Sequence, residues 1–279
     1  MTRLGFAVNP TSESAIALRE RALGWCAVHG IDAWAGEASA REILVAHLPT
    51  TDALVVLGGD GTFLRAVRAV ADVDVPILGI NSGKIGFLSK GEAIQTEAVL
   101  AMLAEGAYDL EPRMLVEASV LPGGRPTEKA AYIGLNEAAI VRGSQARVVR
   151  LEVLIDDSHL ATYIADGLVV ASPTGSTGYS FSAGGPILDP TSRNLVVTPV
   201  AAYLAGIRSI VVSPRHVVTV RVESAHDVLM SIDGREDTAL AVGDSVAVRA
   251  REQPVRFIEP RGAPPFWDLL RRKVELLPS

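Results

Sequence analysis

Five consecutive residues, Gly58-Gly59-Asp60-Gly61-Thr62, are of the types that phosphate chemistry uses. They follow an apolar run at 53–57 and precede a helix-like run at 63–68, so the pattern predicts a strand, a tight turn and the start of a helix. Glycines let the backbone approach a ligand closely, and the first N–H groups of a helix favour anions. A phosphate group is therefore the expected ligand.

Asp60 is the unusual member of this loop, because a carboxylate repels a phosphate. It is tolerated there if a cation bridges the two groups or if the carboxylate accepts a proton. This combination predicts phosphoryl transfer.

A second stretch, residues 172–185, is rich in small polar residues: ten of its fourteen residues are Gly, Ser or Thr. It has two interpretations, a mobile surface loop or a binding site. Pro173, Tyr179 and Phe181 favour the binding site, because flexible linkers lack such anchors. Hydroxyl groups and bare backbone suit sugar and phosphate oxygens, and Tyr179 can lie against a base or ring.

The first part of the chain must position the Asp60 loop. Strand-like runs at 4–8, 54–57 and 77–80 alternate with helical patterns at 14–28 and 63–71, which is typical of an α/β domain with a parallel sheet. We expect this phosphate-binding domain to comprise residues 1–112.

From about residue 113 the pattern changes to closely spaced strands. It predicts a mostly β, sandwich-like C-terminal domain at 113–258, with strands near 115–120, 151–155, 160–164, 167–171, 195–198, 217–222, 228–232 and 246–250. After a Pro- and Gly-rich break at 259–265, Phe266, Leu269, Leu270, Val274 and Leu277 recur at helical spacing. We expect residues 259–279 to return to the N-terminal domain, with this last helix packing on it.

Composition limits the classes of partner. The chain has 279 residues and a net charge of −6, and its one dense basic run, Arg271-Arg272-Lys273, is interpreted as a solvated helix face. We therefore expect neither nucleic acid nor membrane as a partner. Cys26, the single cysteine, fits a reducing compartment, and Asn9-Pro10 interrupts the start too early for a signal peptide, so a cytoplasmic location is expected.

Both polar loops occur in an order that resembles the NAD kinase family. The resemblance also includes residues 79–89, Asn136-Glu137 and Asp166-Gly167, and it extends from about Asn9 to the final helix. Lipid kinases share the first loop, and phosphofructokinases share it with Ser in place of Thr. The run Pro173-Thr174-Gly175-Ser176-Thr177 is what singles out NAD kinases.

The resemblance implies transfer of the terminal phosphoryl group of ATP, or of inorganic polyphosphate, to the 2′-hydroxyl of the adenosine ribose of NAD, which produces NADP. Mg²⁺ or another divalent cation is the implied cofactor, ATP and NAD are the implied substrates, and no separate structural metal site is expected. A homodimer or homotetramer is implied, in which a neighbouring chain completes the nucleotide site.

By resemblance, Asp60 is the catalytic residue, which accepts the proton of the ribose hydroxyl or holds that hydroxyl and the metal in place. The resemblance places NAD between the domains. The implied nucleotide-binding residues are Gly58, Gly59, Gly61 and Thr62 for phosphate, Asn136, Glu137, Asp166, Thr177, Gly178, Tyr179, Ser180 and Ser182 for NAD, Phe87 for adenine, and Arg65 and Arg147 for phosphate or ribose.

Several of these residues also have structural interpretations. Asn136-Glu137 also fits a strand-end turn or a helix cap, and Asp166-Gly167 and Asp233-Gly234 fit hairpin turns. We retain Asp166 as a site residue and interpret Asp233 as a turn. Arg65 also fits a solvated helix face, and Phe87 also fits the core.

Other signatures are absent from the sequence. Residues 79–84 lack the spacing and hydroxyl of a phosphate-binding Walker loop, no dehydrogenase fingerprint follows a strand, and the histidines lack zinc spacing. Relative to the family pattern, Ser172 stands for Thr, Gly178 for Ala and Arg235 for Gln, and residues 199–208 diverge. A lipid kinase and a dinucleotide sensor without turnover remain as alternative functions.

Overall fold

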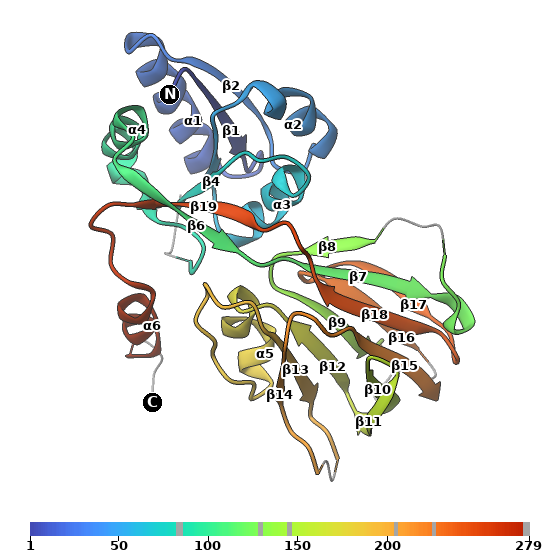
Figure 1. Ribbon diagram of the computed structural model, residues 1–279. Helices are drawn as coiled ribbons and strands as arrows, with labels where there is room; N and C mark the ends of the chain where they lie inside the picture. The colour runs from blue at the N-terminus through green and yellow to red at the C-terminus, as the bar shows by residue number, and fades with distance from the viewer. Residues whose placement is uncertain (82–85, 128–130, 144–146, 204–205, 225–226, 276–279) are drawn as a thin grey trace. The chain divides into compact units, whose positions relative to one another are not determined.

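The computed structural model describes residues 1–81, 86–127, 131–143, 147–203, 206–224 and 227–275 (Figure 1). Residues 82–85 of the predicted 79–89 motif, residues 204–205 of the divergent segment, Leu277 and the side chains of Lys273 and Val274 lie outside the described part. The chain forms two compact units: Met1–Pro112 with Val255–Ser279, and Arg113–Pro254.

The first unit is built on a sheet that has seven strands among the described residues, in the order β2-β1-β3-β4-β19-β6, with β5 beside β4. The strands β1, β2, β3, β4, β5 and β19 pair in parallel wherever they are neighbours. Their bounds are β1 Arg3–Val8, β2 Asp32–Glu37, β3 Ala53–Leu57, β4 Ile77–Asn81, β5 Gly91–Glu92, β6 Tyr108–Arg113 and β19 Val255–Pro260.

The helices of this unit are α1 Glu13–Val28, α2 Arg41–His47, α3 Asp60–Val70, α4 Thr96–Glu105 and α6 Phe266–Glu275, with short 3₁₀ helices η1 Leu48–Thr50 and η2 Ala93–Gln95. Ser12 caps α1 by accepting a hydrogen bond from the Ala15 amide at 3.3 Å, which is the usual function of serine at this position. Buried residues of α1 and α4 form one apolar cluster with one face of the strands.

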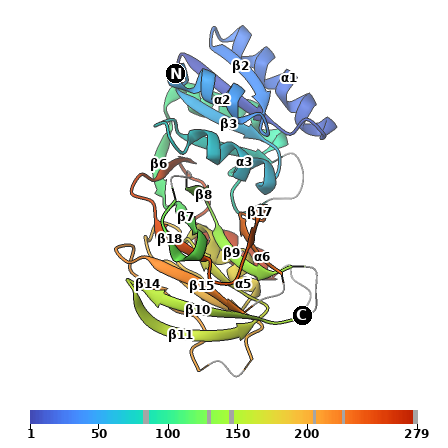
Figure 2. The same cartoon turned by 90° about the vertical axis from the view of Figure 1, so that its right-hand side faces the viewer.

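Helix α3 starts directly after β3 and packs through Phe63. The ring of Phe63 meets that of Phe257 on β19 edge to face, with centroids 5.0 Å apart. In parallel sheets the carboxyl ends of neighbouring strands lie at one edge, where ligands usually bind. The loop that connects β3 to α3 (Figure 2) therefore shares this edge with the end of β4.

The second unit contains two antiparallel sheets, each with six strands among the described residues: β11-β10-β15-β18-β7-β8 and β14-β13-β12-β9-β16-β17. The bounds are β7 Val116–Leu121, β8 Tyr132–Gly134, β9 Glu137–Arg142, β10 Val149–Ile155, β11 Ser158–Ala165, β12 Gly167–Ala171, β13 Leu195–Val200, β14 Ile210–Val212, β15 Val218–Ser224, β16 Val228–Ile232, β17 Arg235–Leu240 and β18 Ser245–Ala250. Its short helices are η3 Pro122–Gly124, η4 Thr174–Thr177 and α5 Tyr179–Ser182.

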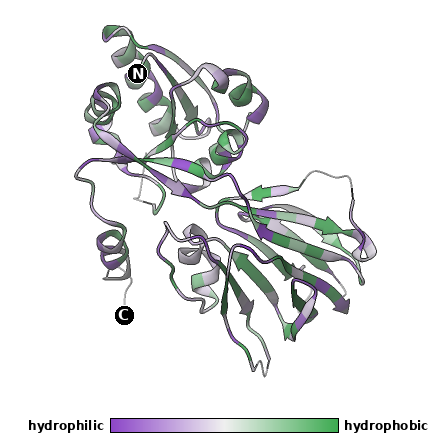
Figure 3. Ribbon diagram, viewed as in Figure 1, coloured by the Kyte–Doolittle hydropathy of each residue, from purple (hydrophilic) through white to green (hydrophobic). Residues whose placement is uncertain are grey.

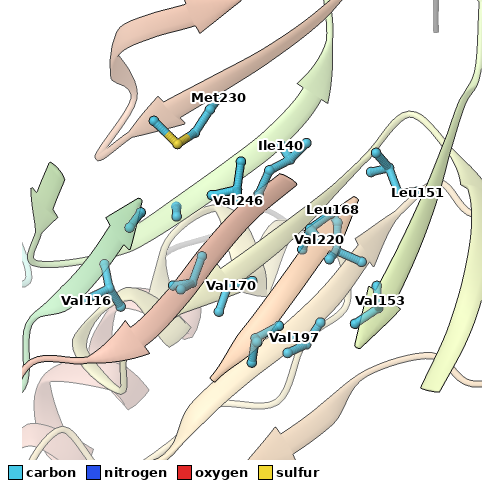
Figure 4. Close-up of a cluster of buried hydrophobic side chains, with 14 of the residues drawn as sticks. Val116, Ile140, Leu151, Val153, Leu168, Val170, Val197, Val220, Met230 and Val246 are labelled. Atoms are coloured by element: carbon cyan, nitrogen blue, oxygen red, sulfur yellow. The ribbon is translucent and has the colours of Figure 1, made fainter. Parts of the chain in front are cut away.

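Apolar side chains from both sheets form one core in this unit. Val116, Leu151, Val153, Val220 and Val246 come from one sheet, and Ile140, Leu168, Val170, Val197 and Met230 come from the other (Figure 4). Strands such as β12 are hydrophobic along their whole length (Figure 3), because the opposite face of the β12 sheet also carries buried residues such as Val169 and Val196. The predicted sandwich-like arrangement is confirmed.

The predicted fold class is therefore correct. A helix also occurs where the sequence predicts the last one, at Phe266–Glu275. Phe266, Leu269 and Leu270 are half-buried on α6, and α6 belongs to the first unit. There Leu269 and Arg272 line a cavity of about 240 Å³ together with Ser89, Lys90 and Gln95. The sequence predicts a break at 259–265, but the first two of these residues end strand β19.

Candidate active site

In the first unit, the Asp60 loop forms the junction between β3 and α3. The Gly58 amide donates to the Ile80 carbonyl at 3.1 Å, and the Thr62 amide donates to the Gly59 carbonyl at 2.9 Å. A Cβ atom on Gly58 would lie 2.6 Å from Thr62 Oγ1, so glycine is required there. The amides of Asp60 and Gly61 lie in the first turn of α3, where N–H groups have no carbonyl one turn back and favour an anion.

The Asp60 carboxylate is held by the segment that follows β4. Its oxygens accept hydrogen bonds from the amides of Phe87 at 3.1 Å and Leu88 at 3.4 Å. A Cβ atom on Gly86 would lie 1.7 Å from Asp60 Oδ1, so this neighbour must be glycine. Asp60 is only partly exposed. The carboxylate is thus oriented by backbone donors and retains access to solvent.

Arg65 and Phe87 both follow this loop in the chain, and both are half-buried. Arg65 is on α3, one turn after Gly61. The backbone of Phe87 supports Asp60, which gives it a structural function beside its predicted contact with adenine.

In the second unit, the polar loop after β12 packs against the segment that precedes β9. The Ser172 amide donates to the Asn136 carbonyl at 2.7 Å, and Ser172 Oγ donates to the Leu135 carbonyl at 2.5 Å. A Cβ atom on Gly175 would lie 2.1 Å from the Asn136 carbonyl oxygen. The backbone at Gly175 therefore lies directly against Asn136, which fixes the path of residues 172–178 beside Asn136 and Glu137. The polar loop contains η4, and α5 follows at Tyr179–Ser182.

Glu137 is the most perturbed acid of this unit. It is 7% exposed, and a Cβ atom on Gly178 would lie 3.5 Å from its Oε2. No hydrogen-bond partner for Oε2 occurs among the described residues. Burial, and secondly the charge of Asp233, raises the pKa of Glu137 to about 8. A buried carboxyl oxygen with no protein partner is suited to a hydroxyl group supplied by a ligand.

Tyr179 interacts with both Glu137 and Asp166, although the two acids lie at opposite ends of the β9–β12 strand pair. Asp166 forms an ion pair with Arg142, with 2.9 Å between Oδ1 and Nε. Burial raises the pKa of Tyr179, and the charges of Asp166 and Glu137 raise it further. Tyr179 is 39% exposed, which leaves its ring accessible to a ligand.

The other hydroxyl residues of the loop differ in accessibility. Thr177 Oγ1 donates to the Thr174 carbonyl at 3.1 Å, and exposed Ser182 donates to the Gly178 carbonyl at 3.5 Å. Ser180, by contrast, is fully buried, and its hydroxyl lies 3.1 Å from that of Thr198. Arg147 is exposed, just before β10.

The alternatives for the Asp-Gly pairs are resolved. Asp166 and Gly167 do not form a hairpin turn, because β11 and β12 belong to different sheets. Asp233 and Gly234 do form the two-residue turn between β16 and β17, as predicted. Asn136 and Glu137 lead into and begin strand β9, so the helix cap is wrong.

Three supporting residues are absent from the predicted set. Gly86 seats Asp60, Arg142 pairs with Asp166, and the carboxylate of Asp233 binds the backbone at Leu135, Asn136 and Glu137. The glycine-rich character of the motif at 79–89 is a signal for Gly86. No local signal distinguishes Arg142 or the buried function of Asp233.

No group of three or more His, Cys, Asp or Glu side chains that could hold a metal ion occurs within the described ranges. In the same ranges, no helix is both long enough and apolar enough to span a membrane.

Comparison with known proteins gives concordant results. The ATP-NAD kinase N-terminal domain model matches residues 26–108, and the ATP-NAD kinase C-terminal domain model matches residues 135–260. The NAD kinase of Chloroflexus aurantiacus is 35% identical over 270 residues, which is 97% of each chain. The NAD kinase of Symbiobacterium thermophilum is 44% identical over 224 residues, 80% of this chain and 78% of the relative.

Two solved structures share the fold. Yeast NADH kinase in complex with NADH has a TM-score of 0.84 at 22% identity, covering 99% of this chain and 87% of that one. An NAD kinase from Archaeoglobus fulgidus in complex with ATP has a TM-score of 0.80 at 24% identity, covering 98% and 99%.

Proposed function

This chain belongs to the NAD kinase family and phosphorylates NAD to NADP, and we propose that it transfers the terminal phosphoryl group of ATP to the 2′-hydroxyl of the adenosine ribose. One observation supports the assignment of the chemistry most directly. The Asp60 carboxylate is oriented by the Phe87 and Leu88 amides and lies at the N-terminal turn of α3, where N–H groups favour phosphate.

In the proposed reaction, Asp60 accepts the proton of the ribose 2′-hydroxyl. The ribose oxygen then forms a bond to the terminal phosphorus of ATP, and the bond between that phosphorus and the bridging oxygen breaks, so ADP leaves. Since phosphoryl transfer depends mainly on positioning and charge neutralisation, the amides of Gly59, Asp60 and Gly61 are the proposed phosphate donors. The Gly58 and Thr62 amides are excluded, because backbone carbonyls already accept their hydrogen bonds.

Mg²⁺ fits this site, because it is commonly bound through one or two carboxylates together with substrate phosphates. Asp60 is the protein carboxylate that would hold it, and the ion would neutralise charge on the phosphate oxygens.

The NAD contacts are proposed for the second unit. Glu137 and Asp166 are suited to accept hydrogen bonds from ribose hydroxyls, and the exposed ring of Tyr179 offers a stacking surface. The further proposed NAD contacts of this unit are Asn136, Arg147, Thr177, Gly178 and Ser182. Those of the first unit are Arg65 and Phe87. Ser180 is left out of the proposed contacts because its hydroxyl is fully buried and bonded to Thr198. A homo-oligomeric, cytoplasmic enzyme is part of the proposal.

The test is to incubate the protein with Mg²⁺, ATP and NAD and to measure NADP, for the wild type and for Asp60→Asn. We expect a loss of rate of at least about 100-fold with NAD binding largely retained, as for removal of a general base. Asp72→Asn is the matched control, because Asp72 follows the same helix and forms an exposed ion pair with Arg41. Its rate should be unchanged.

Unchanged turnover by Asp60→Asn would refute the role of Asp60. NAD binding without NADP formation by the wild type would instead indicate a dinucleotide sensor.

A further inference from the structure

The turn at Asp233-Gly234 has a geometry that its sequence explains. Both residues have positive φ, 53° for Asp233 and 69° for Gly234, and they connect Ile232 and Arg235, which pair across the hairpin. Two-residue hairpin turns of this kind favour Asp-Gly because both positions are left-handed. The turn alone, however, does not require the Asp side chain to be buried.

The Asp233 side chain points into the unit and binds a neighbouring segment. Its Oδ2 accepts a hydrogen bond from the Leu135 amide at 2.8 Å, and its Oδ1 accepts hydrogen bonds from Asn136 at 2.7 Å and Glu137 at 3.2 Å. Its own amide donates to the Glu137 carbonyl at 3.0 Å. Asp233 is only 8% exposed. Hydrogen bonds from backbone donors to a buried carboxylate are among the stronger ones in proteins.

These bonds reach the polar loop through Asn136. Its carbonyl accepts the Ser172 amide and lies against Gly175, so a shift of residues 135–137 would displace residues 172–178. Asp233 therefore supports two of the segments that carry proposed NAD contacts, residues 135–137 and 172–178.

From these contacts we propose that Asp233 is a positioning residue for NAD: it fixes Asn136 and Glu137 and disfavours negative charge on Glu137 until a ribose hydroxyl is bound. The inference rests on the proposed function, since it assumes that Asn136 and Glu137 contact NAD.

Electrostatics support the second part of this proposal. Burial and the charge of Asp233, from the β16–β17 turn, raise the pKa of Glu137 on β9 to about 8. Tyr179 on α5 also interacts with Glu137, and Asp166 and Arg142 act on Tyr179. At neutral pH Glu137 is protonated in the free protein, and it ionises as the pH rises through about 8. Since the ionised form accepts ribose hydroxyls, kcat/KM for NAD should rise over the same pH range.

Asp233→Asn tests the proposal. The amide retains one acceptor oxygen but presents a donor to the Leu135 amide and carries no charge. At about pH 9, where Glu137 is ionised in both proteins, we expect KM for NAD to rise about 10-fold while kcat falls less than about 3-fold. The midpoint of the rise of kcat/KM with pH should move down by about one unit, because the repulsion from Asp233 is lost.

Asp244→Asn is the matched control. Asp244 also accepts two backbone hydrogen bonds at a turn, from Gly123 and Ala241, both at 2.8 Å, and neither of these partners is a proposed NAD contact. It should lower the melting temperature without changing KM or the pH midpoint.

The inference would be overturned if Asp233→Asn had the same KM for NAD as the wild type and the same midpoint for the rise of kcat/KM with pH. If this variant does not fold, Glu137→Gln provides the second test: it should abolish the pH-dependent rise, and a rise that persists would also overturn the inference. Failure of the proposed function is distinguished from this result, because the wild type would then form no NADP.

Discussion

At the scale of single residues, the acid proposed for each unit has opposite surroundings. Asp60 receives two backbone donors and remains partly exposed, which suits a group that meets a charged ligand. Glu137 is buried with an oxygen that has no partner among the described residues, and the backbone donors next to it bind Asp233 instead. The donors therefore fix the position of Glu137 without stabilising its charge.

This arrangement predicts that Glu137 makes folding depend on pH. Its pKa is about 8 in the folded chain, against an ordinary value of 4.5 for a glutamate, so its contribution to stability is fully present below about pH 4.5. The contribution is lost as the pH rises through about 8. We expect Glu137→Gln to remove this fall, so that the variant unfolds at a higher temperature than the wild type at about pH 9, with little difference at about pH 5.

Thermal unfolding at these pH values, without nucleotide, checks this prediction. Glu223→Gln is the control, because Glu223 is in a surface ion pair with Arg150, and its pH dependence should match that of the wild type. An identical fall of stability in Glu137→Gln and the wild type would show that Glu137 is ionised in the folded protein.

At the scale of elements, the loop at 172–178 depends on one close approach of backbone to backbone. A Cβ atom on Gly175 would lie 2.1 Å from the Asn136 carbonyl oxygen and 2.5 Å from its carbon, so Gly175→Ala must displace one of the two segments. We expect a lower melting temperature and a rise of at least about 10-fold in KM for NAD.

Gly206→Ala is the matched control for this prediction. Among the described residues, no atom outside its chain neighbours would lie within 4 Å of the added Cβ atom, and the φ of Gly206 is not positive. Its KM should change less than about 3-fold. Similar kinetics for the two variants would mean that the loop does not carry the NAD contacts.

Whether an element can be predicted from the sequence depends on how local its pattern is. The strand, turn and helix around Asp60 are contiguous, so their local pattern is sufficient to predict them. Strand β2 is not predicted, because Asp32–Glu37 has no apolar run and lies at a sheet edge. Strand β19 is missed because prolines flank or end it, and its pairing partner β4 is distant in the chain.

The site follows the same rule. Asn136 and Glu137 have only a short local pattern, and they are identified by family resemblance. Asp233 is correctly predicted as a turn from its neighbour Gly234, but its hydrogen bonds to Leu135, Asn136 and Glu137 join residues about 97 positions apart in the chain. No periodicity within a local window contains that information.

At the scale of the whole molecule, the first unit is made from two separate pieces of chain. Residues 113–254 form a unit of their own between β6 and β19, and β19 lies between β4 and β6 in the first sheet. Ile258 of β19 is fully buried in the apolar cluster of α1 and α4, and Phe257 contacts Phe63. The sheet of the first unit is therefore incomplete without β19, which comes from the second piece of chain.

This connectivity predicts different behaviour for two fragments. Fragment 113–254 contains both of its sheets and their shared core, so it should unfold cooperatively on heating. Fragment 1–112 lacks β19, which leaves Phe63 and the edges of β4 and β6 uncovered, so it should show no cooperative transition. Joining 1–112 to 255–279 through a short Gly/Ser linker should restore the transition, because it returns the missing strand. Calorimetry of the three proteins measures this, and a cooperative transition in 1–112 alone would mean that the first sheet folds without β19.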